Sequence, residues 1–158
     1  MAEQPNSCDS VINDERIVVL GLLAESAARL QRSAGEAMEE QSGIPLAFYE
    51  VMVRIRRSEA GRLTMSEVAN ETVYSSGGMT RLIDRMVDAG FVERVDCPTD
   101  RRTVFVALTD AGIAQLEQAT EVHLDQLDRL LSSRLSCDER TQLRDMLVKL
   151  TAEADALA

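Results

Sequence analysis

Apolar residues recur at helical spacing over most of the chain. From residue 15 to about residue 41 they lie three and four positions apart, which predicts one long amphipathic helix. Gly43 and Pro45 interrupt this pattern, and Pro45 suits the first position of the next helix. A second apolar pattern runs from Leu46 to Ile55, and we expect that helix to end in the region from Arg54 to Ser58, before a turn at Gly61.

Residues 64–90 predict two short helices joined by a turn. Thr64 and Glu67 have the spacing of a capping box, so the first helix should begin at Met65. Ser75 offers a cap for the second helix, and Gly90 supplies a left-handed stop. One face of the second helix is apolar and comprises Met79, Leu82, Ile83, Met86 and Val87. The opposite face is polar, as in a recognition helix, and comprises Ser76, Gly77, Thr80, Arg81, Asp84 and Arg85.

A β-hairpin should follow this second helix directly. Phe91, Val92 and Val95 form its first strand, and residues 103–108, which are rich in β-branched and aromatic side chains, form the second. The loop between the strands, residues 96–102, is too long for a two-residue hairpin turn. We therefore expect it to project as a wing that ends in two arginines.

The order and spacing of these elements resemble those of the MarR family of bacterial winged helix-turn-helix regulators. The matching segments are the helix-turn-helix at 63–90, the phrase Phe91-Val92-Glu93-Arg94, the wing with Asp100, Arg101 and Arg102, and the closing Leu108-Thr109-Asp110-Ala111-Gly112. The resemblance implies a mainly α fold with a small β-hairpin wing, in which a winged helix-turn-helix is joined to a helical dimerisation domain.

The chain beyond the wing predicts two more helices. Thr109 should cap a helix that runs to about Arg134, and Ser136 with Glu139 forms a second capping box for the last helix. These helices and the first one carry apolar stripes that one winged-helix unit could not cover, so we expect a homodimer. The resemblance divides a single domain, residues 1–158, into dimerisation helices at 15–45 and 110–158 and a DNA-binding region at 46–109.

The net charge of −10 at first disfavours a nucleic-acid partner, but the charges are unevenly distributed. Residues 54–106 contain nine of the 17 basic residues and eight of the 27 acidic ones, so the excess acid lies in the flanks. This distribution permits DNA binding by the central part of the chain. No apolar run approaches the length of about 18 residues that a membrane span needs, and we expect a cytoplasmic protein without a membrane partner.

The chemistry of the remaining residues favours neither an enzyme nor a metalloprotein. Cys8, Cys97 and Cys137 show no CxxC spacing, and His123 is the single histidine, so we expect no zinc site and no cofactor. Nucleophile-elbow, P-loop and dinucleotide-binding motifs are missing from the sequence. The thiols are expected to be inert, although the arginines near Cys97 leave cysteine-based redox sensing as an alternative.

Together the pattern and the resemblance predict a dimeric transcriptional regulator that binds double-stranded DNA at a pseudo-palindromic operator. We expect it to act as a repressor. Paired glycines on the recognition helix would let the backbone approach phosphate, and Asp100 is expected to brace Arg102 for the minor groove. The predicted DNA-binding residues are Ser75, Ser76, Gly77, Gly78, Thr80, Arg81, Arg85, Asp100, Arg101 and Arg102.

The resemblance also implies a small-molecule effector, which would bind between the dimerisation helices and the winged helix. Phe48, Tyr49 and Met52 could line such a pocket for an aromatic or phenolic compound, although core packing is the simpler interpretation of these residues. The alternative function, from another class, is a winged-helix module that binds a protein and no nucleic acid.

Overall fold

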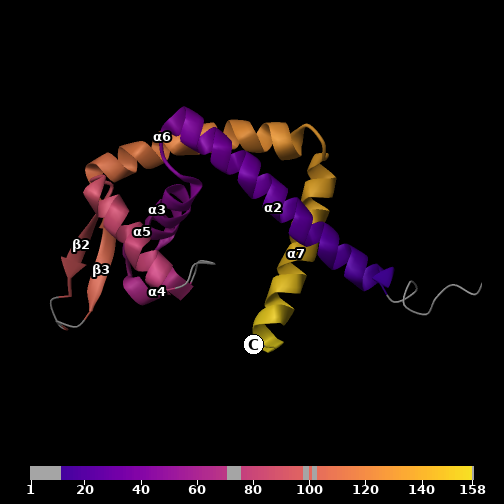
Figure 1. Ribbon diagram of the computed structural model, residues 1–158, viewed down its shortest axis with the longest axis horizontal. Helices are drawn as coiled ribbons and strands as arrows, with labels where there is room; N and C mark the ends of the chain where they lie inside the picture. The colour runs from indigo at the N-terminus through magenta and orange to yellow at the C-terminus, as the bar shows by residue number, and fades with distance from the viewer. Residues whose placement is uncertain (1–11, 71–75, 98–99, 101–102, 158) are drawn as a thin grey trace, which may run out of the picture.

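Two long helices, α2 and α6, extend from a smaller lobe that contains α3, α4, α5 and the three strands, and α7 follows at the far end of α6 (Figure 1). The computed structural model describes residues 12–70, 76–97, 100 and 103–157. Within these ranges the elements are α2 (Glu15–Ser42), α3 (Leu46–Arg57), β1 (Arg62–Thr64), α4 (Met65–Asn70), α5 (Ser76–Asp88), β2 (Val92–Asp96), β3 (Val104–Leu108), α6 (Asp110–Leu127), the π-helical turn η1 (Asp128–Ser132) and α7 (Cys137–Leu157). The predicted mainly α fold with a β-hairpin wing is confirmed.

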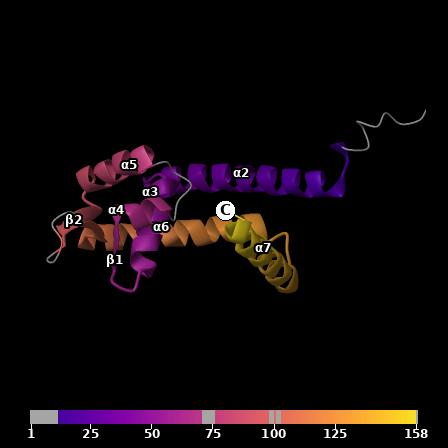
Figure 2. The same ribbon diagram turned by 90° about the horizontal axis from the view of Figure 1, so that it is seen from below.

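Helices α2 and α6 lie side by side in opposite directions, so segments that are far apart in the sequence pack together (Figure 2). The side-chain amide of Gln115 donates to the carbonyl oxygen of Ser42 at 2.8 Å. Further along the pair, the amide of Gln126 donates to Oγ of Ser33 at 2.9 Å. These hydrogen bonds fix the register of the two long helices in addition to their apolar contact.

Capping residues begin and end the helices close to the predicted positions. The N–H of Thr64 donates to Oε2 of Glu67 at 2.6 Å, and the N–H of Glu67 donates to Oγ1 of Thr64 at 3.2 Å, so α4 begins at Met65 as predicted. The backbone N–H of Thr64, and then its hydroxyl, hold the pKa of Glu67 below its ordinary value. Gly43 ends α2 at φ 74°, and Pro45 precedes α3 instead of occupying its first position.

The sheet contains one more strand than the predicted hairpin. Its strand order is β1-β3-β2, with both pairs antiparallel, and Leu63 of β1 lies opposite Val106 of β3. Strand β1 has three residues, too few for an alternating pattern to be recognised in the sequence. Its buried residue, Leu63, joins the sheet to the core of the lobe.

The apolar face predicted for the second helix of the helix-turn-helix forms the core of the lobe. Met79, Ile83 and Met86 of α5 are fully buried, and Leu82 is 9% exposed. They belong to one cluster with residues of α3, α4 and the sheet, including Val51, Ile55, Val68, Val92 and Val106. Because the apolar face of α5 is occupied in this way, its polar face is left to solvent.

The helix after the wing is less regular than predicted. It is α-helical only to Leu127 and then forms η1, whereas its apolar spacing predicted one helix to about Arg134. In the π-helical turn the N–H of Ser133 donates to the carbonyl oxygen of Asp128, five residues earlier, at 2.9 Å. A π turn is defined by backbone hydrogen bonds between residues five positions apart, which the apolar spacing did not reveal.

Four residues form the interhelical joint between the end of α5 and the start of α6: Gly90, Phe91, Thr109 and Gly112. The hydroxyl of Thr109 donates to the carbonyl oxygen of Gly90 at 2.6 Å, and its N–H donates to that of Phe91 at 3.1 Å. The N–H of Gly112 donates to Oγ1 of Thr109 at 3.0 Å, which also caps α6. A Cβ atom at residue 112 would lie 1.9 Å from the carbonyl oxygen of Phe91, so the backbones approach closely only because residue 112 is glycine.

The described helices show no candidate for a transmembrane segment, since none combines sufficient length with an apolar composition.

Replacement of Gly112 by alanine is expected to destabilise the fold. The new methyl group would meet backbone atoms that cannot rotate away, and overpacking of this kind costs about 1–3 kcal/mol or more. The measurement is urea unfolding of both proteins at one fixed concentration. Gly35→Ala is the control, because its Cβ would meet only Leu46 Cβ at 3.9 Å, and it should leave stability equal or slightly higher. Equal stability of the two variants would contradict the proposed strain at the joint.

Candidate nucleic-acid interface

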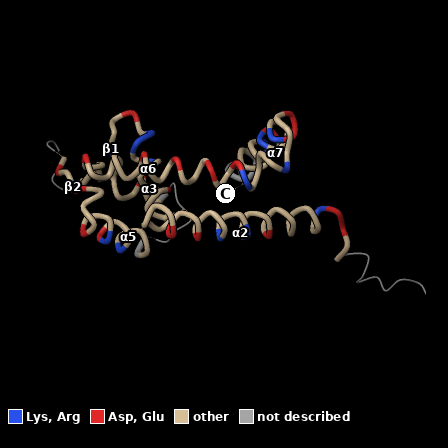
Figure 3. Tube along the Cα trace, turned by 90° about the horizontal axis from the view of Figure 1, so that it is seen from above, with Lys and Arg blue, Asp and Glu red and all other residues tan. Residues whose placement is uncertain are grey.

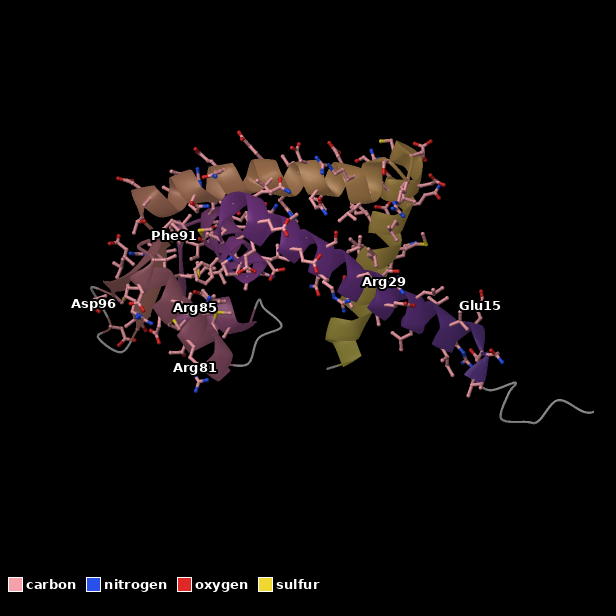
Figure 4. All side chains as sticks on the ribbon, turned by 45° about the horizontal axis from the view of Figure 1, so that its top comes forward. Glu15, Arg29, Arg81, Arg85, Phe91 and Asp96 are labelled. Carbon is pink, nitrogen blue, oxygen red and sulfur yellow. The ribbon has the colours of Figure 1, made fainter. Side chains whose placement is uncertain are left out.

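The polar face of α5 is exposed along the described part of the helix. Gly78, Thr80, Arg81, Asp84 and Arg85 are all exposed. Figure 4 shows Arg81 projecting outward from the end of the lobe, away from α2 and α6. A surface of this kind can reach the edges of base pairs, since a helix fits the major groove of B-DNA and arginine pairs with guanine through two hydrogen bonds.

Arg85 lies on the same helix, but its side chain contacts an aromatic ring within the lobe. Its guanidinium carbon is 5.2 Å from the centroid of the Phe48 ring, a cation–π geometry. Phe48 is 5% exposed and meets Phe91 edge-on, with the ring centroids 6.4 Å apart. The Arg85 side chain thus links α5 to α3 and to the interhelical joint, whereas no contact of this type is recorded for Arg81 within the described chain.

An ion pair joins α5 to the first strand of the wing. Nη2 of Arg94 in β2 donates to Oδ1 of Asp84 at 2.6 Å, and both side chains are partly exposed. Acidic and basic residues therefore lie next to each other on this side of the lobe (Figure 3). Neither residue was among the predicted DNA-binding residues. They are ten positions apart in the sequence and come into contact only because β2 folds back along α5.

The wing is described only in part. Thr103 closes its loop, because its N–H donates to the carbonyl oxygen of Asp100 at 3.0 Å and its hydroxyl donates to Oδ2 of Asp100 at 2.8 Å. The expected brace between Asp100 and Arg102 lies outside the described residues, as do Ser75 and Arg101. The backbone of Ser76 and Gly77 belongs to α5, but their side-chain environment is not described.

A third arginine supports the sheet beneath the wing. The guanidinium carbon of Arg62 lies 4.4 Å from the ring centroid of Phe105, which is on the adjacent strand β3. This contact fixes a positive charge close to the root of the wing. The sequence placed Arg62 in a basic segment but gave no indication of its aromatic partner.

The three predicted pocket residues of α3 do not line one common cavity. Tyr49 lines a cavity of about 220 Å³ that lies between α2, α3, α6 and η1. Phe48 lines a separate hollow on the side of Arg85, and Met52 is fully buried in the core. Glu50 and His123 line the same cavity as Tyr49, and the sequence analysis did not include them.

His123 packs against Tyr49, with the ring centroids 4.9 Å apart. Its Nδ1 atom is buried and has no hydrogen-bond partner among the described residues. Burial lowers the pKa of His123 from its ordinary value, while the negative charge of Glu50 acts in the opposite direction. Burial in the cavity wall therefore favours the neutral form of the imidazole.

Other candidate chemistry is limited to two thiols in the described chain. Cys97 is half-buried at the start of the wing loop, and Cys137 is exposed at the start of α7. Cys8 lies outside the described residues. Within the described ranges no three His, Cys, Asp or Glu residues come together in a group that could bind a metal.

Comparisons with known proteins place this geometry among DNA-binding regulators. The sequence model of the MarR family matches residues 42–103. The multiple antibiotic resistance protein MarR of Escherichia coli K12 is 35% identical over 107 residues, which cover 68% of this chain and 73% of that protein. A crystal structure of a cysteine-to-serine mutant of MarR from E. coli, complexed with operator DNA, has a TM-score of 0.76 and 30% identity, and covers 87% of this chain and 96% of that one. The MarR-family regulator Sco3205 of Streptomyces coelicolor, crystallised with DNA, has a TM-score of 0.79 and 26% identity, and covers 90% and 89%.

The two exposed arginines of α5 should differ in their effect on stability. Arg85→Ala removes the contact with Phe48 and should lower the free energy of unfolding by about 0.5–1 kcal/mol. Arg81→Ala removes a side chain that projects into solvent and should change it by less than about 0.5 kcal/mol. Urea unfolding without DNA, at one protein concentration, measures both values. A loss that is as large for Arg81→Ala as for Arg85→Ala would contradict this assignment.

Proposed function

The chain belongs to the MarR family of transcriptional regulators, which are not enzymes, and we propose that it binds a pseudo-palindromic operator as a homodimer. In this proposal α5 of each subunit enters the major groove, and the wing lies along the neighbouring minor groove. The regulator acts as a repressor in the cytoplasm, and a small-molecule effector releases it from DNA.

The polar face of α5 is the observation that carries the DNA-binding proposal. The apolar stripe of α5 packs in the core of the lobe, and Gly78, Thr80 and Arg81 on its other side are exposed. Arg62 adds positive charge at the root of the wing. Two relatives with the same fold, MarR and Sco3205, have been crystallised with DNA.

Exposed apolar side chains on α2 and α7 support the dimer. Leu20 is 68% exposed and Leu22 58% on α2, and Val148 is 59% exposed and Leu150 53% on α7. Full burial of one such side chain is worth about 1.5–3 kcal/mol, so several of them on one isolated chain favour association. A second copy presents the same two faces and can cover them symmetrically. The two α5 helices would then face successive major grooves about 34–36 Å apart.

The cavity beside Tyr49 supports the effector part of the proposal. It lies where α2 and α6 of the dimerisation part meet α3 of the winged part. A ligand there would contact both parts and could change their relative orientation, and with it the spacing of the two α5 helices. Phe48 and Met52, on other sides of α3, would support the pocket through the core.

Two alternatives differ from this proposal in measurable ways. A winged-helix module that binds only protein would show no affinity for DNA even at low salt, whereas phosphate contacts make log K fall linearly with log salt. A redox-sensing regulator would lose operator binding on treatment with peroxide and would keep it in Cys97→Ser, because Cys97 lies in the wing.

Arg81→Ala is expected to weaken operator binding by about 1–3 kcal/mol and to relax the preference at one base pair. The assay is fluorescence anisotropy with a duplex selected from random sequences, at several salt concentrations. Arg129→Ala, which removes a charge from η1 at the far end of α6, is the control and should bind like the wild type. An equal loss on all DNA sequences would move Arg81 to a phosphate contact, and absence of binding by the wild type at low salt would refute the function.

Leu20→Glu is expected to shift the protein from dimer to monomer. The substitution puts a carboxylate on a face that the second subunit should cover, and burial of an unpaired charge is strongly unfavourable. Analytical ultracentrifugation over a range of concentrations gives the dissociation constant. Glu25→Gln, a change on the same helix at an exposed ion pair with Arg29, should leave the dimer intact. A wild-type protein that is monomeric at micromolar concentration would exclude the dimer.

A further inference from the structure

The cavity beside Tyr49 has an apolar wall and a small set of polar side chains. Six lining residues are leucine or alanine, and the polar ones are Gln31, Tyr49, Glu50 and His123. Its volume of about 220 Å³ can be compared with an engineered cavity of about 150 Å³ that holds benzene. The cavity therefore has room for one aromatic ring with small substituents.

Glu50 is the polar side chain of the cavity that favours ligands able to donate a hydrogen bond. It offers only acceptor oxygens when ionised, whereas Gln31, Tyr49 and a neutral imidazole at His123 can each donate as well as accept. No Lys or Arg belongs to the lining of this cavity within the described chain. A ligand with a negative charge would meet the carboxylate of Glu50 in a partly apolar site, where like charges repel more strongly than in water.

A neighbouring, wider hollow of about 470 Å³ is lined by arginines. That hollow shares Tyr49, Glu50 and His123 with the inner cavity and adds Arg54 and Arg57. One guanidinium nitrogen of Arg54 donates to the backbone carbonyl oxygen of Glu50 at 3.0 Å, which holds that side chain along α3. Glu50 thus lies at the boundary between the two spaces, and its carboxylate borders both of them.

We propose that Glu50 determines the specificity of the effector cavity, which accepts an uncharged aromatic hydrogen-bond donor and rejects aromatic carboxylates. This inference rests on the effector site proposed above and adds the charge of its ligand. The aromatic ring lies against the leucines and Tyr49, and the O–H or N–H group of the ligand donates to the carboxylate of Glu50. An aromatic carboxylate has the same ring, but in this position its negative charge would lie close to the negative charge of Glu50 and be repelled by it.

The test compares two probes of similar size, 4-methylphenol and benzoate, by isothermal titration calorimetry. At pH 7.5 phenols are uncharged, since their pKa is near 10, whereas benzoate is ionised. The full-length wild-type protein should bind 4-methylphenol at least about tenfold more tightly than benzoate, and Glu50→Gln should remove most of this preference. Glu40→Gln is the matched control, because Glu40 is an exposed glutamate of α2 that does not line the cavity, and it should keep the wild-type preference.

A second variant locates the bound probe. Leu46→Phe enlarges a half-buried side chain of the lining and should weaken binding of 4-methylphenol by fivefold or more. Equal or tighter binding of benzoate by the wild type, no binding of either probe, or an unchanged preference in Glu50→Gln would overturn the proposal. Benzoate binding that is lost in Arg57→Ala would place an acid in the outer hollow and would also overturn it. Calorimetry needs no DNA, so these outcomes are independent of whether the protein binds an operator.

Discussion

At Gly112 two backbone segments approach closely, and this contact joins the end of α5 to the start of α6. The carbonyl group of Phe91 occupies the space that a side chain at residue 112 would need, and Thr109 ties the surrounding carbonyl and N–H groups together. One side of this contact ends α5, and the other begins α6, the helix that packs along α2. The start of α6 is therefore held against the end of α5 by backbone contact, which allows less local freedom than a side-chain interface.

Helix α3 connects the chemistry of the two proposed sites. On one side its Phe48 ring lies under the guanidinium group of Arg85 and against Phe91. The next two residues, Tyr49 and Glu50, line the cavity on the side of α2 and α6. If a ligand displaced α3, the packed side chains would transmit this displacement to α5. Such a chain of packed contacts can couple two distant sites.

Local signals in the sequence were sufficient for most of the helices and for the core. Capping boxes at Thr64 and Ser136 gave the start of α4 and α7, because such caps involve residues three positions apart. The apolar stripe of α5 predicted which of its side chains are buried. Strand β1 was missed because three residues are too few to show a period, and the π turn η1 was missed because it is defined by backbone hydrogen bonds.

The features of the site that were missed depend on contacts between distant segments. Arg85 was recognised as an exposed basic residue, but its position over Phe48 requires α3 and α5 to be packed together. The same holds for Asp84 with Arg94, and for the cavity in which Glu50 of α3 lies near His123 of α6. A pattern along one helix specifies which side faces the core, whereas it does not specify which residue of another helix it will meet.

The pairing of α2 with α6 also determines the order in which the chain can fold during synthesis. Ser42 and Gln115 are 73 residues apart, and Ser33 and Gln126 are 93 apart, so α2 leaves the ribosome long before its partner is made. At about 5–20 residues per second the delay is several seconds or more, far longer than a small helical lobe needs to fold. The elements from α3 to β3 are contiguous in the sequence and can fold first. During this time the apolar side of α2 is exposed to solvent. The apolar side of α2 therefore stays exposed on the nascent chain until α6 emerges.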